Sequence, residues 1–196
     1  MDGVDYYDYA PTVVMTRSVV LGGMPGTPYR EVGYELAALT GVSLMDLDRW
    51  VEHRIGRTIW DYKRSISAPM IGKLEDQALL KALSSLPNGL IIAGEMTLAN
   101  EINLRAIRNS AGLAFLKLSP EVAYWRVRDK IAERGPRQYH SIEHPLTTFE
   151  QFYPLAQLMA NAETEAELLY DVEQLSSNDI LRRLREMLPK LSEGRS

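Results

Sequence analysis

The sequence predicts an α/β protein built as a three-layer sandwich, in which helices cover both faces of a five-stranded parallel sheet. Short apolar runs alternate with longer segments of helical periodicity, the pattern of strands joined by crossover helices. The run at 89–93 is almost continuously apolar, as in a strand buried on both faces. The length of 196 residues suits one domain, expected at 17–190, with an extension at 1–16 and a tail at 191–196.

Each expected strand is a short apolar run bounded by glycine or polar residues. In chain order, the strands are expected at 17–21, 42–45, 89–93, 113–118 and, as a weaker run, 168–172. The residues expected to form the core of the sheet are Val19, Val20, Leu90, Ile91, Ile92, Leu113 and Phe115.

The helices are predicted by apolar positions three and four residues apart. They are expected at 28–39, 47–55, 58–63, 69–83, 99–108, 120–133, 149–163 and 178–188. Thr27 can cap the first helix, and Pro28 suits its first position, where no backbone donor is needed. Gly56 ends the second helix. The stretch 134–147, rich in glycine, proline and histidine, predicts a loop long enough to serve as a lid.

Composition excludes several classes of function. A net charge of -4 without a basic excess argues against a nucleic-acid partner, and the absence of cysteine excludes disulfides and thiolate metal sites. No signal peptide or membrane-spanning run is recognisable, so a cytoplasmic location is expected. His140 and His144 have the spacing of metal ligands on a helix, but Pro145 indicates a polar loop, and no metal site is expected.

The segment between the first strand and the first helix has the position of a phosphate-binding loop. Residues 23–30 read G-M-P-G-T-P-Y-R. Such loops hold phosphate with backbone N–H groups, a lysine and a magnesium-binding hydroxyl. The segment resembles the loop of shikimate kinases, G-x-x-G-x-G-K-[ST]-T-x-G, which aligns without a gap onto residues 23–33. The resemblance implies the fold of P-loop and nucleoside monophosphate kinases, with ATP and magnesium as cofactors of an active member.

The residues that bind phosphate in that loop are replaced here. Pro28 removes a backbone donor, Tyr29 stands in place of the lysine, and Arg30 stands in place of the magnesium-binding hydroxyl. Arg30 could act as a substitute cation or could face solvent and pair with Glu31 or Tyr34. Its position, about 100° further round the helix, favours the second role. The members of this degenerate phosphate loop are Gly23, Gly26, Thr27, Tyr29 and Arg30.

A second segment resembles the family more closely. Residues 46–59 match its D-x-D-x-x-[IV]-E-x-x-x-G-x-[ST]-I pattern without a gap. The resemblance implies that Asp46 lies near the magnesium site and that Asp48 accepts hydrogen bonds from the ring hydroxyls of the substrate. Alternatively, the two aspartates only cap the helix that follows.

Other substrate-binding positions of the family are changed. Its substrate arginine aligns with Gly72, next to Lys73, and its triple-glycine turn lies near Gly94, where Glu95 follows. Arg137 stands where the lid carries its catalytic arginine. Residues 138–181 contain eight acidic residues and no lysine or arginine, although the family places a substrate arginine there. The residues expected to line the remaining ligand cleft are Asp46, Asp48, Lys73, Glu95 and Arg137.

Three functions are compatible with this pattern. The favoured hypothesis is a pseudoenzyme that transfers no phosphate, needs no cofactor, and serves as a small-molecule sensor or protein-binding partner. The first alternative is an active ATP-dependent small-molecule kinase with an unorthodox phosphate loop, in which Asp48 acts as base and Arg137 as the lid cation. The second is a purely structural module. The acidic stretch 138–181 could bind a basic partner or be a solvated face. It predicts that any small ligand is neutral or weakly charged, or is held mainly by Arg137 and Lys73 on the opposite wall of the cleft.

Overall fold

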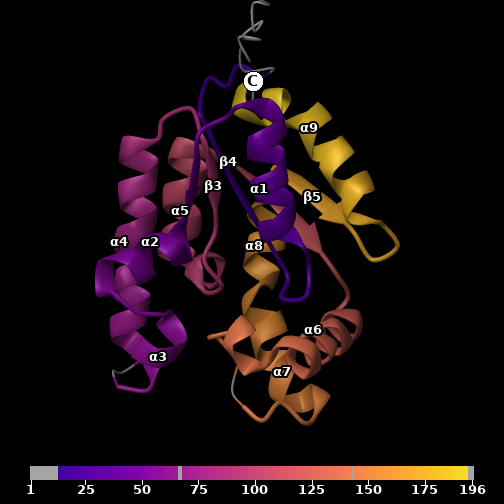
Figure 1. Cartoon of the computed structure of the whole chain (residues 1–196). Helices are drawn as coiled ribbons and strands as arrows, with labels where there is room; N and C mark the ends of the chain where they lie inside the picture. Colours follow the sequence, from indigo (N-terminus) through magenta and orange to yellow (C-terminus); the bar gives the residue numbers. More distant parts are fainter. Residues whose placement is uncertain (1–12, 66–67, 143, 194–196) are drawn as a thin grey trace, which may run out of the picture.

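The computed structural model describes residues 13–65, 68–142 and 144–193, which form five parallel strands with helices on both faces (Figure 1). The strands are β1 (Ser18–Gly23), β2 (Leu44–Asp46), β3 (Leu90–Ile92), β4 (Ala111–Lys117) and β5 (Leu168–Asp171). Their order in the sheet is β2-β3-β1-β4-β5, so β1 lies at the centre. All four pairings are parallel. The predicted α/β class and five-stranded parallel sheet are confirmed.

Nine α-helices and two 3-10 turns connect the strands within the described residues. The α-helices are α1 (Tyr29–Thr40), α2 (Leu47–Ile55), α3 (Ile59–Lys63), α4 (Ala68–Ser85), α5 (Glu101–Ser110), α6 (Pro120–Arg134), α7 (Phe149–Leu158), α8 (Ala160–Glu165) and α9 (Ser177–Glu193). The 3-10 turns are η1 (Thr97–Ala99) and η2 (Pro136–Gln138). Helices α1 and α9 pack together on one face of the sheet, and α5 and α8 pack on the other (Figure 1). None of the described helices is long and apolar enough to cross a membrane.

The core of the sheet consists of the residues that the sequence predicts. All seven predicted core residues of β1, β3 and β4 are at most 3% exposed. The register places Val19 beside Leu90 and Val20 beside both Ile91 and Leu113. The side chains of the central strands are therefore enclosed by neighbouring strands and by the helices of both layers.

Two local features differ from the sequence-based expectations. The hydroxyl of Thr27 donates to the Met24 carbonyl at 2.7 Å instead of capping α1, whose N-cap is Pro28 without a side-chain bond. The expected helix at 149–163 is divided into α7 and α8 at Met159.

The packed part of the chain is also longer than the expected domain. Val13 and Met15 are buried in the core, and α9 continues to Glu193, with Leu191 buried. The hydroxyl of Thr16 donates to the Ser192 carbonyl at 2.5 Å, which joins the two ends of this part of the chain. Residues 1–12 and 194–196, which make up most of the expected extension and half of the expected tail, lie outside the described residues.

Replacing Ile91 by alanine tests this account of the core. Ile91 is fully buried in β3 between β2 and β1. Loss of its side chain should therefore lower the free energy of unfolding by about 2–5 kcal/mol, measured by urea denaturation. The matched control is Ile102→Ala on α5, where the side chain is 73% exposed and the cost should be below about 0.5 kcal/mol. A cost below about 1 kcal/mol for Ile91→Ala would contradict the assignment.

Candidate functional site

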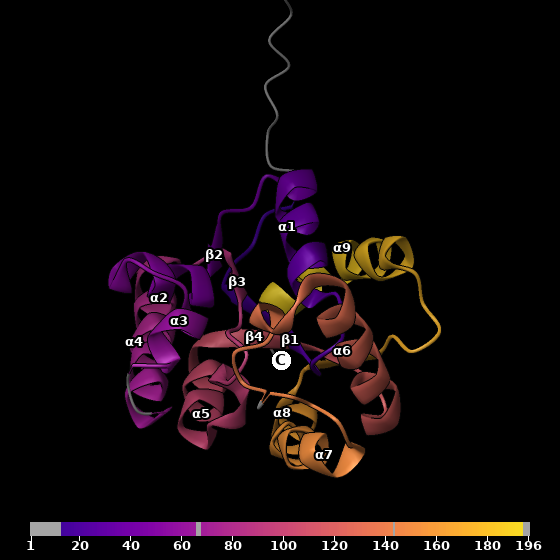
Figure 2. The same cartoon turned by 60° about the horizontal axis from the view of Figure 1, so that its bottom comes forward.

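The candidate site lies where β1, β2 and β3 reach their carboxyl ends, the usual position for ligands in parallel α/β sheets. The phosphate-loop segment follows β1, the two aspartates lie at the end of β2 and in α2, and Glu95 follows β3. The segment that joins α6 to α7 crosses this end of the sheet (Figure 2). The site is thus assembled from parts of the chain that are distant in sequence.

Arg30 lies among the carboxylates of this site. Its guanidinium forms a close ion pair with Asp48, and a second one with Asp46 at 3.7 Å between Nη1 and Oδ2. Its Nε also donates to the Tyr29 hydroxyl at 3.4 Å. The expectation that Arg30 faces solvent and pairs with Glu31 or Tyr34 is wrong. Two buried carboxylates at the end of β2 require a cation, and Arg30 is within reach of both.

The two aspartates have different surroundings. Asp46 caps α2, because its Oδ1 accepts the Arg49 backbone N–H at 3.1 Å, and its Oδ2 accepts the Tyr34 hydroxyl at 3.0 Å. Asp48 caps nothing and is buried. Its Oδ1 lies 2.3 Å from the point where a Cβ on Gly94 would stand, so only glycine leaves room for this carboxylate. The helix-capping interpretation therefore holds for Asp46 alone.

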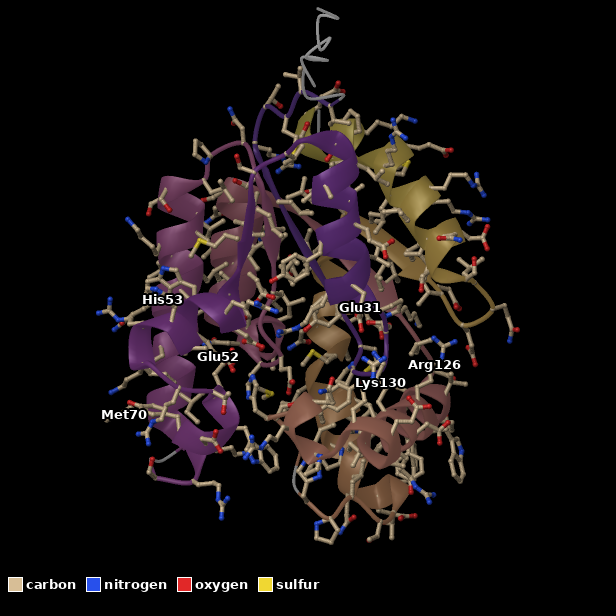
Figure 3. The ribbon with its side chains drawn as sticks, viewed as in Figure 1. Glu31, Glu52, His53, Met70, Arg126 and Lys130 are labelled. Carbon is tan, nitrogen blue, oxygen red and sulfur yellow. The ribbon has the colours of Figure 1, made fainter. Side chains whose placement is uncertain are left out.

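The phosphate-loop segment is filled by side chains of the protein itself. Tyr29 is buried, and Tyr139 from the α6–α7 connection is buried on the other side of the same cavity. The cavity that remains, bordered by Tyr29, Arg30 and Tyr139, has a volume of about 70 Å³. Pockets for small organic ligands usually measure roughly 300–1,000 Å³. Lys130 on α6 closes the outer side by pairing with Glu31 on α1 at 3.3 Å (Figure 3).

A second group of ionisable side chains is buried beside Asp48. Glu75 on α4 and His140 in the α6–α7 connection are 2% and 7% exposed. His140 Nε2 lies 3.4 Å from Asp48 Oδ2 and 3.7 Å from Glu75 Oε1. Glu95 is held nearby, because its Oε2 accepts the Ser141 backbone N–H at 2.8 Å. We call Asp48, Glu75, Glu95 and His140 the acid–histidine cluster.

The pKa values in this cluster are displaced from their ordinary ranges. Burial alone would raise the pKa of Asp48, but the charges of Arg30 and His140 outweigh burial and hold it below its usual range. Burial, reinforced by the Asp48 carboxylate, raises the pKa of Glu75. Burial alone would lower the pKa of His140, but the neighbouring carboxylates of Glu95 and Asp48 outweigh it and raise the pKa. Such displacements are typical of functional sites and of buried ion networks.

Sequence reasoning missed two members of the cluster. His140 was expected in a polar loop, but it is buried, whereas His144 packs edge-on against Trp60 with ring centroids 5.0 Å apart. No pattern near His140 signals this burial, because its partners come from other segments. Glu75 had a signal, since it occupies the glutamate position of the family's F-R-x-x-E motif.

Two predicted cleft residues lie elsewhere. Lys73 is exposed on α4, because it is two residues from the buried Glu75 and so faces nearly the opposite side of the helix. Arg137 is 67% exposed at its side chain and pairs with Asp61 on α3 at 3.6 Å. Neither side chain borders the cavity at the phosphate-loop segment. The prediction that these two cations line the cleft is wrong.

Three glutamates of the acidic stretch, Glu163, Glu165 and Glu167, lie outside the expected lid. Glu163 and Glu165 belong to α8, and Glu167 directly precedes β5. Each forms an ion pair, with Lys117 at 2.9 Å, Arg108 at 3.2 Å and Arg17 at 2.6 Å respectively. The neighbouring strands and α5 thus supply the positive charge that the stretch itself lacks.

Comparison with known proteins places the chain in a family. A family model described as shikimate kinase matches residues 26–185. The shikimate kinase of Thermus thermophilus is 25% identical over 182 residues, covering 90% of this chain and 92% of that protein. The shikimate kinase of Symbiobacterium thermophilum is 29% identical over 119 residues, covering 61% of this chain and 68% of that protein.

Solved structures agree with the fold. Shikimate kinase from Acinetobacter baumannii, in complex with shikimate, has a TM-score of 0.74 at 17% identity and covers 91% of this chain and 94% of its own. A gluconokinase from Sinorhizobium meliloti has a TM-score of 0.57 at 16% identity, and the match covers 91% of this chain and 95% of the gluconokinase chain. Because the family model spans most of the chain and the sheet has the arrangement found in these kinases, the chain belongs to the shikimate kinase family.

Proposed function

We propose that this member of the shikimate kinase family is a pseudoenzyme that transfers no phosphate and instead binds a small molecule or a protein. The observation that carries the proposal is the pairing of Arg30 with both Asp46 and Asp48. The family resemblance assigns these aspartates to magnesium and substrate. Here an internal guanidinium engages one oxygen of each carboxylate, so that oxygen is no longer open to the magnesium or substrate of the family pattern.

Loss of nucleotide binding is supported by the filled phosphate-loop segment. A nucleotide needs free backbone N–H groups and a cation at the end of β1. Pro28 has no N–H, Tyr29 is buried where the family lysine stands, and Tyr139 borders the same cavity. The cavity of about 70 Å³ would have to enlarge several-fold before it could admit ATP.

The charge of the cleft also argues against an anionic substrate. Arg30 and Lys130 border the cavity, but carboxylates already engage both, and Glu95 adds a further negative charge. Lys73 and Arg137 face away from the cavity. A ligand of this cleft would therefore be neutral or weakly charged. A basic protein partner at the acidic stretch is less favoured, because Glu163, Glu165 and Glu167 are paired within the domain.

The alternative is an active ATP-dependent kinase, which family membership favours. In that reading Asp48 would accept the proton of the substrate hydroxyl. A general base works best when its pKa lies near the working pH, and the pKa of Asp48 is held well below its usual range. Asp48 is therefore a weak base as long as Arg30 is paired with it.

Calorimetric titration with ATP and magnesium tests the proposal. The wild-type chain should show no binding at about 1 mM ATP, and its midpoint of thermal unfolding should not change. The matched variant is the triple substitution Pro28→Gly, Tyr29→Lys and Arg30→Ser, which restores the G-K-S sequence of the family loop. It should gain measurable ATP affinity.

A dissociation constant in the micromolar range for wild-type ATP binding would overturn the proposal in favour of the kinase alternative. The same thermal assay with shikimate should show no stabilisation. A ligand present at a hundred times its dissociation constant stabilises a protein by roughly 2.7 kcal/mol, so binding would be detectable.

A further inference from the structure

The acid–histidine cluster has the spacing of a metal site. His140 Nε2 lies 3.4 Å from Asp48 Oδ2 and 3.7 Å from Glu75 Oε1. Asp48, Glu95 and His140 also present ligand atoms that all lie within 4.8 Å of one another. Four ligands around zinc, at bonds of roughly 2.0–2.2 Å, stand about 3.3 Å apart. Side-chain rotations would therefore bring these atoms to coordination distance around one ion.

Three buried atoms of the cluster lack a hydrogen-bond partner among the residues that the structure describes. They are Asp48 Oδ1, Glu75 Oε1 and His140 Nε2, and each of these residues is more than nine-tenths buried. A buried polar atom without a partner costs about 1–3 kcal/mol, so native proteins rarely leave several together. A cation bound between Glu75 Oε1 and His140 Nε2, which lie 3.7 Å apart, would give both atoms a partner.

The charges of the acid–histidine cluster also favour a bound cation. The carboxyl groups of Asp48, Glu75 and Glu95 belong to the cluster, and Asp46 lies at its edge. The positive charges facing them are Arg30, which pairs with Asp46 and Asp48, and the protonated form of His140. A buried excess of negative charge is unfavourable unless a cation balances it. A divalent ion bound in place of the His140 proton would carry twice the charge of that proton and would leave Arg30 on Asp48.

We propose that Asp48, Glu75, Glu95 and His140 bind one divalent transition-metal ion of the zinc or manganese class. An imidazole nitrogen together with carboxylate oxygens suits such ions, whereas magnesium prefers oxygen ligands and water. Groups around the cluster hold its ligands in place: the Ser141 backbone N–H bonds to Glu95 at 2.8 Å, and Lys63 Nζ donates to the His140 carbonyl at 2.8 Å. The proposal does not depend on whether the chain transfers phosphate.

The metal would have a structural consequence for the cleft. Its ligands come from α2, α4, the turn after β3 and the α6–α7 connection. One ion would tie the connection to the end of the sheet and keep Tyr139, the residue before His140, over the phosphate-loop segment. Metal binding would then raise the free energy of unfolding of the chain.

The test uses the full chain, dialysed against a chelator and titrated with Zn²⁺ and then Mn²⁺ in the absence of nucleotide. We expect about one ion per chain, a dissociation constant in the micromolar range or below, and a rise in the midpoint of thermal unfolding. His140→Ala and Glu95→Gln should each weaken binding at least about 10-fold. Glu95→Gln keeps an oxygen that can accept the Ser141 backbone N–H. This variant therefore still tests the proposal if His140→Ala fails to fold.

The control is His53→Ala, which removes an exposed histidine on α2 and should leave binding unchanged (Figure 3). A visible absorption band of bound Co²⁺ should disappear in His140→Ala but persist in His53→Ala. The proposal is overturned if the wild-type chain binds no ion at a free-ion concentration of about 100 µM, which is well above the dissociation constant expected here. It is also overturned if His140→Ala and Glu95→Gln both bind the ion as tightly as wild type. ATP binding would contradict the pseudoenzyme proposal and leave this result intact.

Discussion

Two carboxylates are fixed at the end of β2, where the core of the domain meets the cleft, and a cation must balance them. In the family pattern their partners are external, with magnesium near Asp46 and the hydroxyls of the substrate at Asp48. Here Arg30, at the start of α1, supplies a cation from within the chain by pairing with Asp48 and Asp46. Gly94 leaves room for the Asp48 carboxylate, and burial strengthens the ion pair that the carboxylate makes.

The contacts around this pair close the cleft from several sides. Tyr139 borders the remaining cavity, Lys130 pairs with Glu31, and His140 lies against Asp48. The α6–α7 connection, which would cover a substrate in an active kinase, contributes two buried side chains to the site instead. The fold of a kinase is therefore kept, and the protein's own side chains leave a cavity of about 70 Å³ at the phosphate-loop segment.

The sheet could be predicted from the sequence because its strands are continuous apolar runs, and Ile91 and Phe115 are buried as such runs require. The site could be predicted only in part. The positions of the two aspartates could be predicted from a motif that aligns without a gap. Their pairing with Arg30 could not, because Asp48 is 18 residues from Arg30 and no pattern within the first turn of α1 points to it. Lys73 was misplaced because a motif fixes a position along α4 and not the direction of the side chain. His140 is buried by three separate segments, and no local pattern encodes that environment.

The claim that Arg30 replaces an external cation is tested most directly by a double-mutant cycle with Arg30→Met and Asp48→Asn. Each single variant removes one side of the Arg30–Asp48 pair and should lower the free energy of unfolding measurably, whereas the double variant removes both sides. The account predicts a coupling free energy of about 1–3 kcal/mol from urea denaturation. Additive effects within about 0.5 kcal/mol would show that the two side chains do not stabilise one another, and would contradict the account.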